Sequence, residues 1–152
     1  DLVGKGAEMT FAEIVGSLIN RPFKPGGTTQ EGLDCIGLCW RVAKAQGKDV
    51  PDRWRQYEIG NPTYQDLRGP AFLRTVLELF ADIGEAVEPN FVVAGDWLLC
   101  RSLQAEGEYF LALYGGNGNI IASYTDAGVK VYSLRGMTVE IVRAVRLRNG
   151  HC

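Results

Sequence analysis

A chain of 152 residues with a formal net charge of -2 is long enough to bury one hydrophobic core and has no excess of positive charge. The apolar share of 46% and the charged share of 22% are those of an ordinary globular domain. The mixed charge argues against nucleic acid or an anionic membrane surface as the main partner, and no stretch is long and apolar enough to predict a membrane span.

The first eight residues lack the basic start and the long apolar core of a signal peptide. If Met9 is the natural start, residues 1–8 are a leader or an expression remnant, and a single domain occupies residues 9–148. On this interpretation we expect a cytoplasmic protein. A signal removed before the first residue would leave no trace in this sequence.

Helical patterns fill the first half of the chain. A capping box that begins at Thr10 opens an amphipathic helix that ends near Asn20. A polar, glycine-rich loop follows and leads into a second helix, predicted over residues 35–46. Pro70 is well placed as the first residue of a third helix, which Gly84 ends.

After Pro89 the pattern changes to short apolar and alternating runs separated by turn sequences. The predicted strands are Trp97–Cys100, Tyr109–Tyr114, Asn119–Tyr124, Val129–Tyr132 and Val139–Leu147. Helices followed by strands predict an α+β fold, in which the N-terminal helices pack on a C-terminal antiparallel sheet of about five strands.

The second helix begins with a cysteine. Asp34 is suited to the N-cap position, because its side chain can accept from the unpaired N–H groups that open a helix. Cys35 then lies in the first turn, where the helix dipole favours an anion. A thiol at this position ionises more easily, and the thiolate is the nucleophilic form, so Cys35 is a candidate nucleophile.

The other cysteines are expected to be free thiols, since disulfide-stapled domains are usually shorter and richer in cysteine. We interpret Cys39 and Cys100 as small core residues. Zinc would need more ligands than Cys35 and Cys39, and the only histidine is His151, beside the C-terminus, so we expect no metal and no cofactor. A redox pair of Cys35 and Cys39 is a weaker alternative, because thiols four residues apart in a helix do not easily form a disulfide.

A set of short motifs appears in a fixed order along the chain. They are Pro22-Phe23, Gly26-Gly27, Gly32-Leu33-Asp34-Cys35, Gly37-Leu38, Gly47, Pro51, Gly95-Asp96-Trp97-Leu98 and Leu113-Tyr114-Gly115-Gly116-Asn117-Gly118. In their order and spacing, over residues 11–147, the chain resembles the NlpC family of papain-like cell-wall cysteine peptidases. The loop and the helix that follows it look most like the short, single-domain members found in phage tail gene clusters.

The resemblance implies a papain-like fold and a role for several positions. Cys35 matches the nucleophile of the family, whose substrates are γ-D-glutamyl and related bonds in peptidoglycan stem peptides. The histidine that serves as the base falls at Phe110, and the residue that orients it falls at Ala122 or a neighbour. The tyrosine before the glycine pair is Phe23 here, and the small hydroxyl residue after the cysteine is Ile36.

These replacements remove the acid–base chemistry that the family uses. Phenylalanine can neither take the thiol proton nor protonate the leaving amine, and such help is typically worth ~10²–10⁴-fold in rate. We therefore predict a catalytically degenerate domain that binds a cell-wall peptide, or a protein partner such as a phage tail component, instead of cleaving. By resemblance, the binding residues are Asp34, Phe23, Trp40, Trp97 and Phe110.

The alternative is an active thiol hydrolase or acyltransferase that acts on stem peptides through Cys35 and a nonstandard base. The acidic or phenolic groups near the strand ends that flank the expected cleft are Glu106, Glu108, Tyr109 and Asp126. Acidic residues and tyrosines at strand ends are more often solvated loop charges or edge tyrosines than catalytic bases. We expect Asp96 to hold the turn at the start of its strand. The virion or the cell envelope is the alternative location to the cytoplasm.

Overall fold

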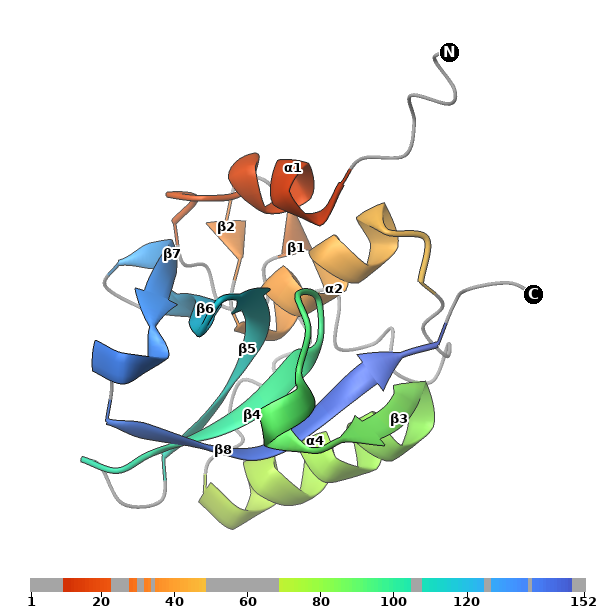
Figure 1. Cartoon of the computed structure of the whole chain (residues 1–152), viewed down its shortest axis with the longest axis vertical. Coiled ribbons are helices and arrows are strands. Elements are labelled where there is room, and N and C mark those ends of the chain that lie inside the picture. The colour runs from red at the N-terminus through yellow and green to blue at the C-terminus, as the bar shows by residue number, and fades with distance from the viewer. Residues whose placement is uncertain are drawn as a thin grey trace.

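The computed structural model of the chain describes residues 10–22, 28–29, 32–33, 35–48, 69–104, 108–124, 127–136 and 138–148 (Figure 1). The α-helices in this part of the chain are α1 (Phe11–Gly16), α2 (Cys35–Ala45) and α4 (Gly69–Ile83). The strands of the main sheet are β3 (Gly84–Val87), β4 (Trp97–Ser102), β5 (Tyr109–Gly116), β6 (Asn119–Tyr124), β7 (Gly128–Ser133) and β8 (Val139–Leu147). The α+β class and the order of helices before sheet are therefore confirmed.

Two shorter kinds of element complete the described chain. Two 3₁₀ turns, η3 (Pro89–Phe91) and η4 (Leu134–Gly136), lie between strands of the sheet. In the loop before α2, β1 (Thr28–Thr29) and β2 (Gly32–Leu33) form an antiparallel pair that the sequence pattern does not predict. Two residues are too few to show a strand periodicity, so this pairing is visible only in the fold.

The main sheet has six antiparallel strands in the order β3-β8-β4-β5-β6-β7, one more than the sequence predicts. The additional strand is β3, a four-residue segment that pairs with β8 in the register Gly84 to Leu147. The sequence places Gly84 only as the end of a helix, because a segment this short at the edge of a sheet has no recognisable alternation. Its strand conformation comes from pairing with a distant part of the chain.

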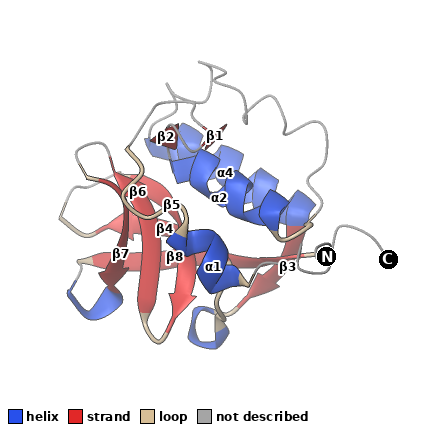
Figure 2. Ribbon diagram, turned by 90° about the horizontal axis from the view of Figure 1, so that it is seen from above, coloured by secondary structure: helices blue, strands red, loops and turns tan. Residues whose placement is uncertain are grey.

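The helices α2 and α4 lie on the same side of the sheet (Figure 2). Their buried residues join one core cluster with inward-facing strand residues such as Leu99, Leu111 and Leu113. The opposite face of the sheet carries a second, smaller cluster. It consists of Leu98, Cys100, Ala112, Ile120, Ala122 and Ala144, with half-buried Phe110, Tyr114, Tyr124 and Tyr132 packed against it. Alternation along each strand divides neighbouring residues between the two faces.

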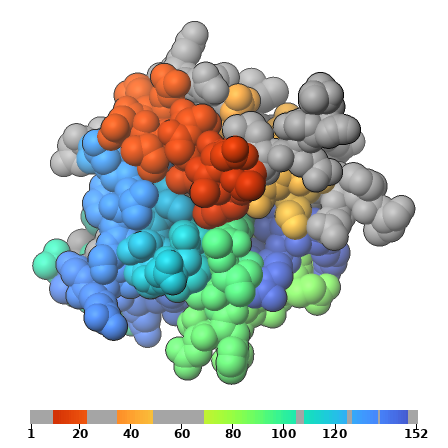
Figure 3. Space-filling model, turned by 45° about the horizontal axis from the view of Figure 1, so that its top comes forward, coloured from red at the N-terminus to blue at the C-terminus, as the bar shows by residue number. Residues whose placement is uncertain are grey.

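The segment after α1 is attached to the sheet at β7. The Asn20 backbone N–H donates to the Val129 carbonyl at 2.8 Å, and the Val129 N–H donates to the Arg21 carbonyl at 2.9 Å. The space-filling view shows this N-terminal segment packed directly against the region of β7 (Figure 3). The predicted capping box of α1 is present, since Thr10 and Glu13 each accept the other's backbone N–H. Within the described residues, no helix has the length and apolar character needed to cross a membrane.

Candidate functional site

The helix α2 begins at Cys35, as the sequence predicts. Its side chain is half-buried and packs against the main core. Among the cysteines that the structure describes, Cys35, Cys39 and Cys100 are thiols and not disulfides, and the last two are fully buried, as expected of core residues. Asp34 and Phe23, predicted as the N-cap and as a binding residue, lie outside the described residues.

Phe110 and Ala122, the positions that the resemblance assigns to the base and its orienter, lie on the same face of the sheet. Phe110 is half-buried on β5, and Ala122 is buried on β6 with 1% of its surface exposed. The two strands are antiparallel, with Leu113 opposite Ile121. Phe110 also faces Cys100 across the β4–β5 pairing. The residue paired with Phe110 on β4 is therefore a buried cysteine.

Tyr124 is the aromatic neighbour of Phe110, and the sequence analysis did not single it out. Continuing the β5–β6 register brings Tyr124 opposite Phe110, and their ring centroids are 5.4 Å apart at an interplanar angle of 61°. The ring of Tyr132 lies 5.2 Å from Tyr124 on its other side. The signal that could have found Tyr124 is its spacing, because residues two apart on a strand share a face and Ala122 precedes it by two.

The phenol of Tyr124 also lies within electrostatic reach of Cys35. Burial raises the pKa of Tyr124 well above its ordinary value, and the nearby Cys100, Tyr132 and Cys35 groups raise it further. Tyr124 is therefore a neutral hydrogen-bonding group at physiological pH. It packs on the sheet face that carries Phe110.

A cavity of about 360 Å³ opens beside these two rings, where β4 ends and β8 begins. Phe110 and Tyr124 form its aromatic part. Its polar lining comes from Ser102, Gln104, Glu108 and Thr138. Of the candidate bases named from sequence, Glu108 lies at this cavity, while Glu106 and Asp126 lie outside the described residues.

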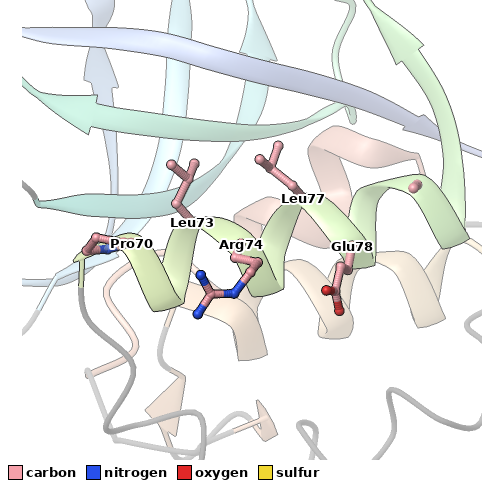
Figure 4. A pocket seen from close by; sticks show the side chains of 6 residues that line it. Pro70, Leu73, Arg74, Leu77 and Glu78 are labelled. Carbon is pink, nitrogen blue, oxygen red and sulfur yellow. The ribbon is translucent and has the colours of Figure 1, made fainter.

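A second hollow lies along α4. It is an open, mainly apolar groove formed by Leu73, Leu77 and Ala81, with Pro70 at one end and with Arg74 and Glu78 beside it (Figure 4). None of the described residues that line it also lines the cavity next to Phe110. The two hollows are therefore separate features.

Comparison with known proteins gives one family. The family model for NlpC/P60 matches residues 20–146. The chain belongs to the NlpC/P60 family. This assignment agrees with the resemblance predicted from its motifs.

Solved NlpC/P60 structures share the fold of this domain at low sequence identity. A family protein from Bacillus cereus has a TM-score of 0.62 and 22% identity over 92% of this chain and 41% of its own. The NlpC/P60 domain of the peptidoglycan hydrolase SagA has a TM-score of 0.58 and 22% identity over 91% of this chain and 100% of its own. NlpC2 from Trichomonas vaginalis has a TM-score of 0.63 and 13% identity over 90% of this chain and 45% of its own.

This NlpC/P60 domain thus spans less than half the length of two of these three chains. The comparison with curated proteins gives no significant match. At identities of 22% or less, the structural likeness establishes the papain-like fold and nothing about the chemistry of individual residues. The chemistry has to be argued from the side chains of this NlpC/P60 domain.

Trp40 and Trp97, expected by resemblance to line a binding cleft, are placed elsewhere in this NlpC/P60 domain. Each has 1% of its surface exposed, and their rings meet edge to face with centroids 5.1 Å apart. The contact joins α2 to the first residue of β4. Side chains this deep cannot contact a ligand at the surface, so the structure gives both tryptophans a packing position in the core.

Asp96 holds the turn before β4, as the sequence predicts. It is 2% exposed and accepts the Val93 backbone N–H at 2.9 Å. Both of its carboxylate oxygens also accept from the Arg146 guanidinium at 3.0 Å. Asp96 is thus committed to the backbone and to a salt bridge. Across the described parts of the chain, His, Cys, Asp and Glu side chains nowhere gather in threes as metal ligands would.

The site of this NlpC/P60 domain therefore combines a thiol, a protonated phenol and an apolar strand position. Hydrolysis by a thiol needs a group that removes its proton and another that protonates the leaving amine. The phenol of Tyr124 can donate a hydrogen bond, but its raised pKa prevents it from acting as a base near neutral pH. Of the described residues that line this cavity, Glu108 is the one with a carboxyl side chain.

Proposed function

We propose that this NlpC/P60 domain is catalytically degenerate and binds a cell-wall peptide, or a protein partner such as a phage tail component, without cleaving it. The observation that carries the proposal is the edge-to-face contact between Phe110 and Tyr124 at the strand position that resemblance assigns to the base. A hydrocarbon ring at this position offers no lone pair for the thiol proton. The cytoplasm is the location that we expect from the sequence, and the virion or the cell envelope, where such a ligand would be met, is the alternative.

The structural surroundings of Phe110 also support the proposal. Ala122 is buried on the adjacent strand, and Cys100 lies opposite Phe110 on the other side. Burial raises the pKa of the Cys100 thiol to about 12, so this group stays protonated. Neither neighbour can replace an imidazole as a base or orient one. The start of a helix lowers the pKa of a thiol such as that of Cys35, but it does not protonate a leaving group.

The second candidate function is a thiol hydrolase or acyltransferase that uses Cys35 with a nonstandard base. The observation that favours it is the carboxylate of Glu108, which lines the cavity next to Phe110 and Tyr124. A carboxylate could accept a proton through a bound water. This mechanism predicts that turnover requires both Cys35 and Glu108.

One experiment separates the two functions. The full chain and its Cys35→Ala variant are incubated with peptidoglycan stem peptides that contain a γ-D-glutamyl bond, and products are followed by mass spectrometry while binding is measured by calorimetry. We expect both proteins to bind the peptide with equal affinity and to form no product. Product formation by the parent chain that disappears in Cys35→Ala would overturn the proposal in favour of the hydrolase.

A further inference from the structure

We propose that the cavity beside Phe110 binds a primary ammonium group of a peptide ligand, with Glu108 as its anionic partner and the Phe110 and Tyr124 rings as its wall. The inference rests on the proposed binding function, because it names the chemical class of ligand for that site. Its basis is the combination of side chains that converge on one cavity of about 360 Å³.

The charge of the side chains that line the cavity favours a cationic group on the ligand. Glu108 lines it, whereas none of the described lining residues is lysine or arginine. Among the described residues Glu108 forms no ion pair. Of the nearby cations, Arg101 is paired with Glu140, and Arg135 precedes the cavity residue Gly136 without lining the cavity itself. A ligand carboxylate would be repelled here, while an ammonium group would gain a charge-assisted hydrogen bond.

The shape and polarity of the lining suit an ammonium on an alkyl chain. Aromatic rings attract a cation to their faces, and Phe110 and Tyr124 both line this cavity. An ammonium group has three N–H donors and no acceptor, so it needs several oxygens around it. The Glu108 carboxylate, the Gln104 amide oxygen and the hydroxyl of Thr138 are such acceptors at this cavity.

The position of the cavity relates the ammonium to the rest of the ligand. Tyr124 lines the cavity and also lies within electrostatic reach of the Cys35 thiol. A peptide whose amino group enters the cavity would lie against the Phe110 and Tyr124 rings. The amino group is either that of a diamino-acid side chain or that of the peptide N-terminus, and the two sources are distinguished by selective acetylation.

The probe is the peptide Ala-γ-D-Glu-Lys in four forms: unmodified, acetylated at the N-terminus, acetylated at the lysine side chain, and acetylated at both. Affinities are measured by calorimetry with the full chain carrying Cys35→Ala, so that turnover does not interfere. We expect acetylation of one of the two amines to weaken binding by about 10-fold, the effect of losing one hydrogen bond to a charged group. The sensitive amine identifies the source of the ammonium.

Glu108→Gln, added to Cys35→Ala, should weaken binding of the free-amine peptide by the same factor and leave binding of the doubly acetylated peptide unchanged. The matched control is Glu78→Gln, another exposed carboxylate, which lies on α4 in the separate groove. Equal affinities of all four peptides, an unchanged affinity in Glu108→Gln, or no binding of the free-amine peptide at millimolar concentration would overturn the inference. Cleavage by the parent chain would instead reject the proposed function and leave the coupling to Glu108 measurable in Cys35→Ala.

Discussion

The rings of Phe110 and Tyr124 meet edge to face across the adjacent strands β5 and β6, with their centroids 5.4 Å apart. Aromatic contacts of this geometry contribute about 0.5–1.5 kcal/mol beyond the area that they bury. By resemblance, the same strand pair carries the base and its orienter in NlpC-type peptidases. In this chain it carries an aromatic contact, and the ring of Tyr124 also meets that of Tyr132.

Replacing Phe110 with histidine tests the relation between this position and the thiol. We expect Phe110→His to increase the rate at which iodoacetamide alkylates Cys35 near pH 7 by about 10-fold or more, because a nearby imidazolium lowers a thiol pKa. Peptide mapping by mass spectrometry quantifies the modification of Cys35. Tyr132→His, on the far side of Tyr124, is the control and should have a smaller effect. Equal rates in the parent and in Phe110→His would show that position 110 does not reach the thiol.

The stability of the domain should fall at alkaline pH. Burial raises the pKa of the Cys100 thiol from 9.0 to about 12, so the folded chain retains a proton that the unfolded chain releases above pH 9. The unfolding free energy therefore decreases as pH rises from about 9 toward 12. Urea unfolding at pH 8 and pH 10.5 measures the decrease, which should be smaller in Cys100→Ala. A pH dependence that is the same in both proteins would contradict the assignment to Cys100.

The Asp96–Arg146 pair should stabilise the turn before β4 more than an exposed pair does. Asp96→Ala removes the buried carboxylate that accepts from the Val93 backbone N–H as well as the salt bridge, and we expect it to cost about 2–4 kcal/mol. Asp96→Asn keeps an acceptor for Val93 and should cost roughly half as much. The exposed Arg101–Glu140 pair is the control, since Arg101→Ala should cost about 0–1 kcal/mol. Equal losses of unfolding free energy in these variants, measured by chemical denaturation, would contradict this prediction.

Gly128 should tolerate no side chain. Its φ is +73°, and a Cβ atom added there would lie 2.2 Å from the Arg21 carbonyl oxygen. Backbone at this distance cannot yield as a flexible side chain would, so Gly128→Ala should destabilise the domain by about 2–4 kcal/mol. Gly136→Ala, where a Cβ meets nothing within 4 Å, should change stability by less than about 0.5 kcal/mol. Thermal denaturation of the two variants gives the comparison.

Trp40 combines complete burial with an unsatisfied group. In the described structure its indole Nε1–H is buried without a hydrogen-bond partner, which costs about 1–3 kcal/mol. Trp40→Phe removes the unsatisfied donor along with some packing, and we expect a net change within about 1 kcal/mol. Trp40→Ala also removes the ring that contacts Trp97 and should cost about 3–5 kcal/mol. Equal losses in the two variants would indicate that the indole N–H is satisfied.

Most of the fold was predictable because its determinants are local. The capping box at Thr10, the start of α2 at Cys35 and the glycine at the end of α4 are features of a few neighbouring residues. Five of the six strands of the main sheet have apolar or alternating patterns of their own, whereas β3 exists only through its pairing with β8. Element type follows from local pattern, and pairing of a short edge segment does not.

The candidate site was predictable only in part. The sequence identified Cys35 as the thiol at a helix start and Phe110 as the position lacking a base. Tyr124 was missed, because its contact with Phe110 depends on the β5–β6 register. Trp40 and Trp97 were assigned to a cleft from resemblance, whereas their depth in the core depends on how α2 packs on β4.

By itself, the sequence determined the α+β class, the family and the absence of a histidine at the position of the base, since these depend on residue identity and order. Only the tertiary structure decided what surrounds Cys35 and Phe110. The rings of Tyr124 and Tyr132 and the carboxylate of Glu108 come from segments that are adjacent in space through strand pairing and side-chain alternation. The properties of a site depend on such distances and on burial, and neither is set by position along the chain.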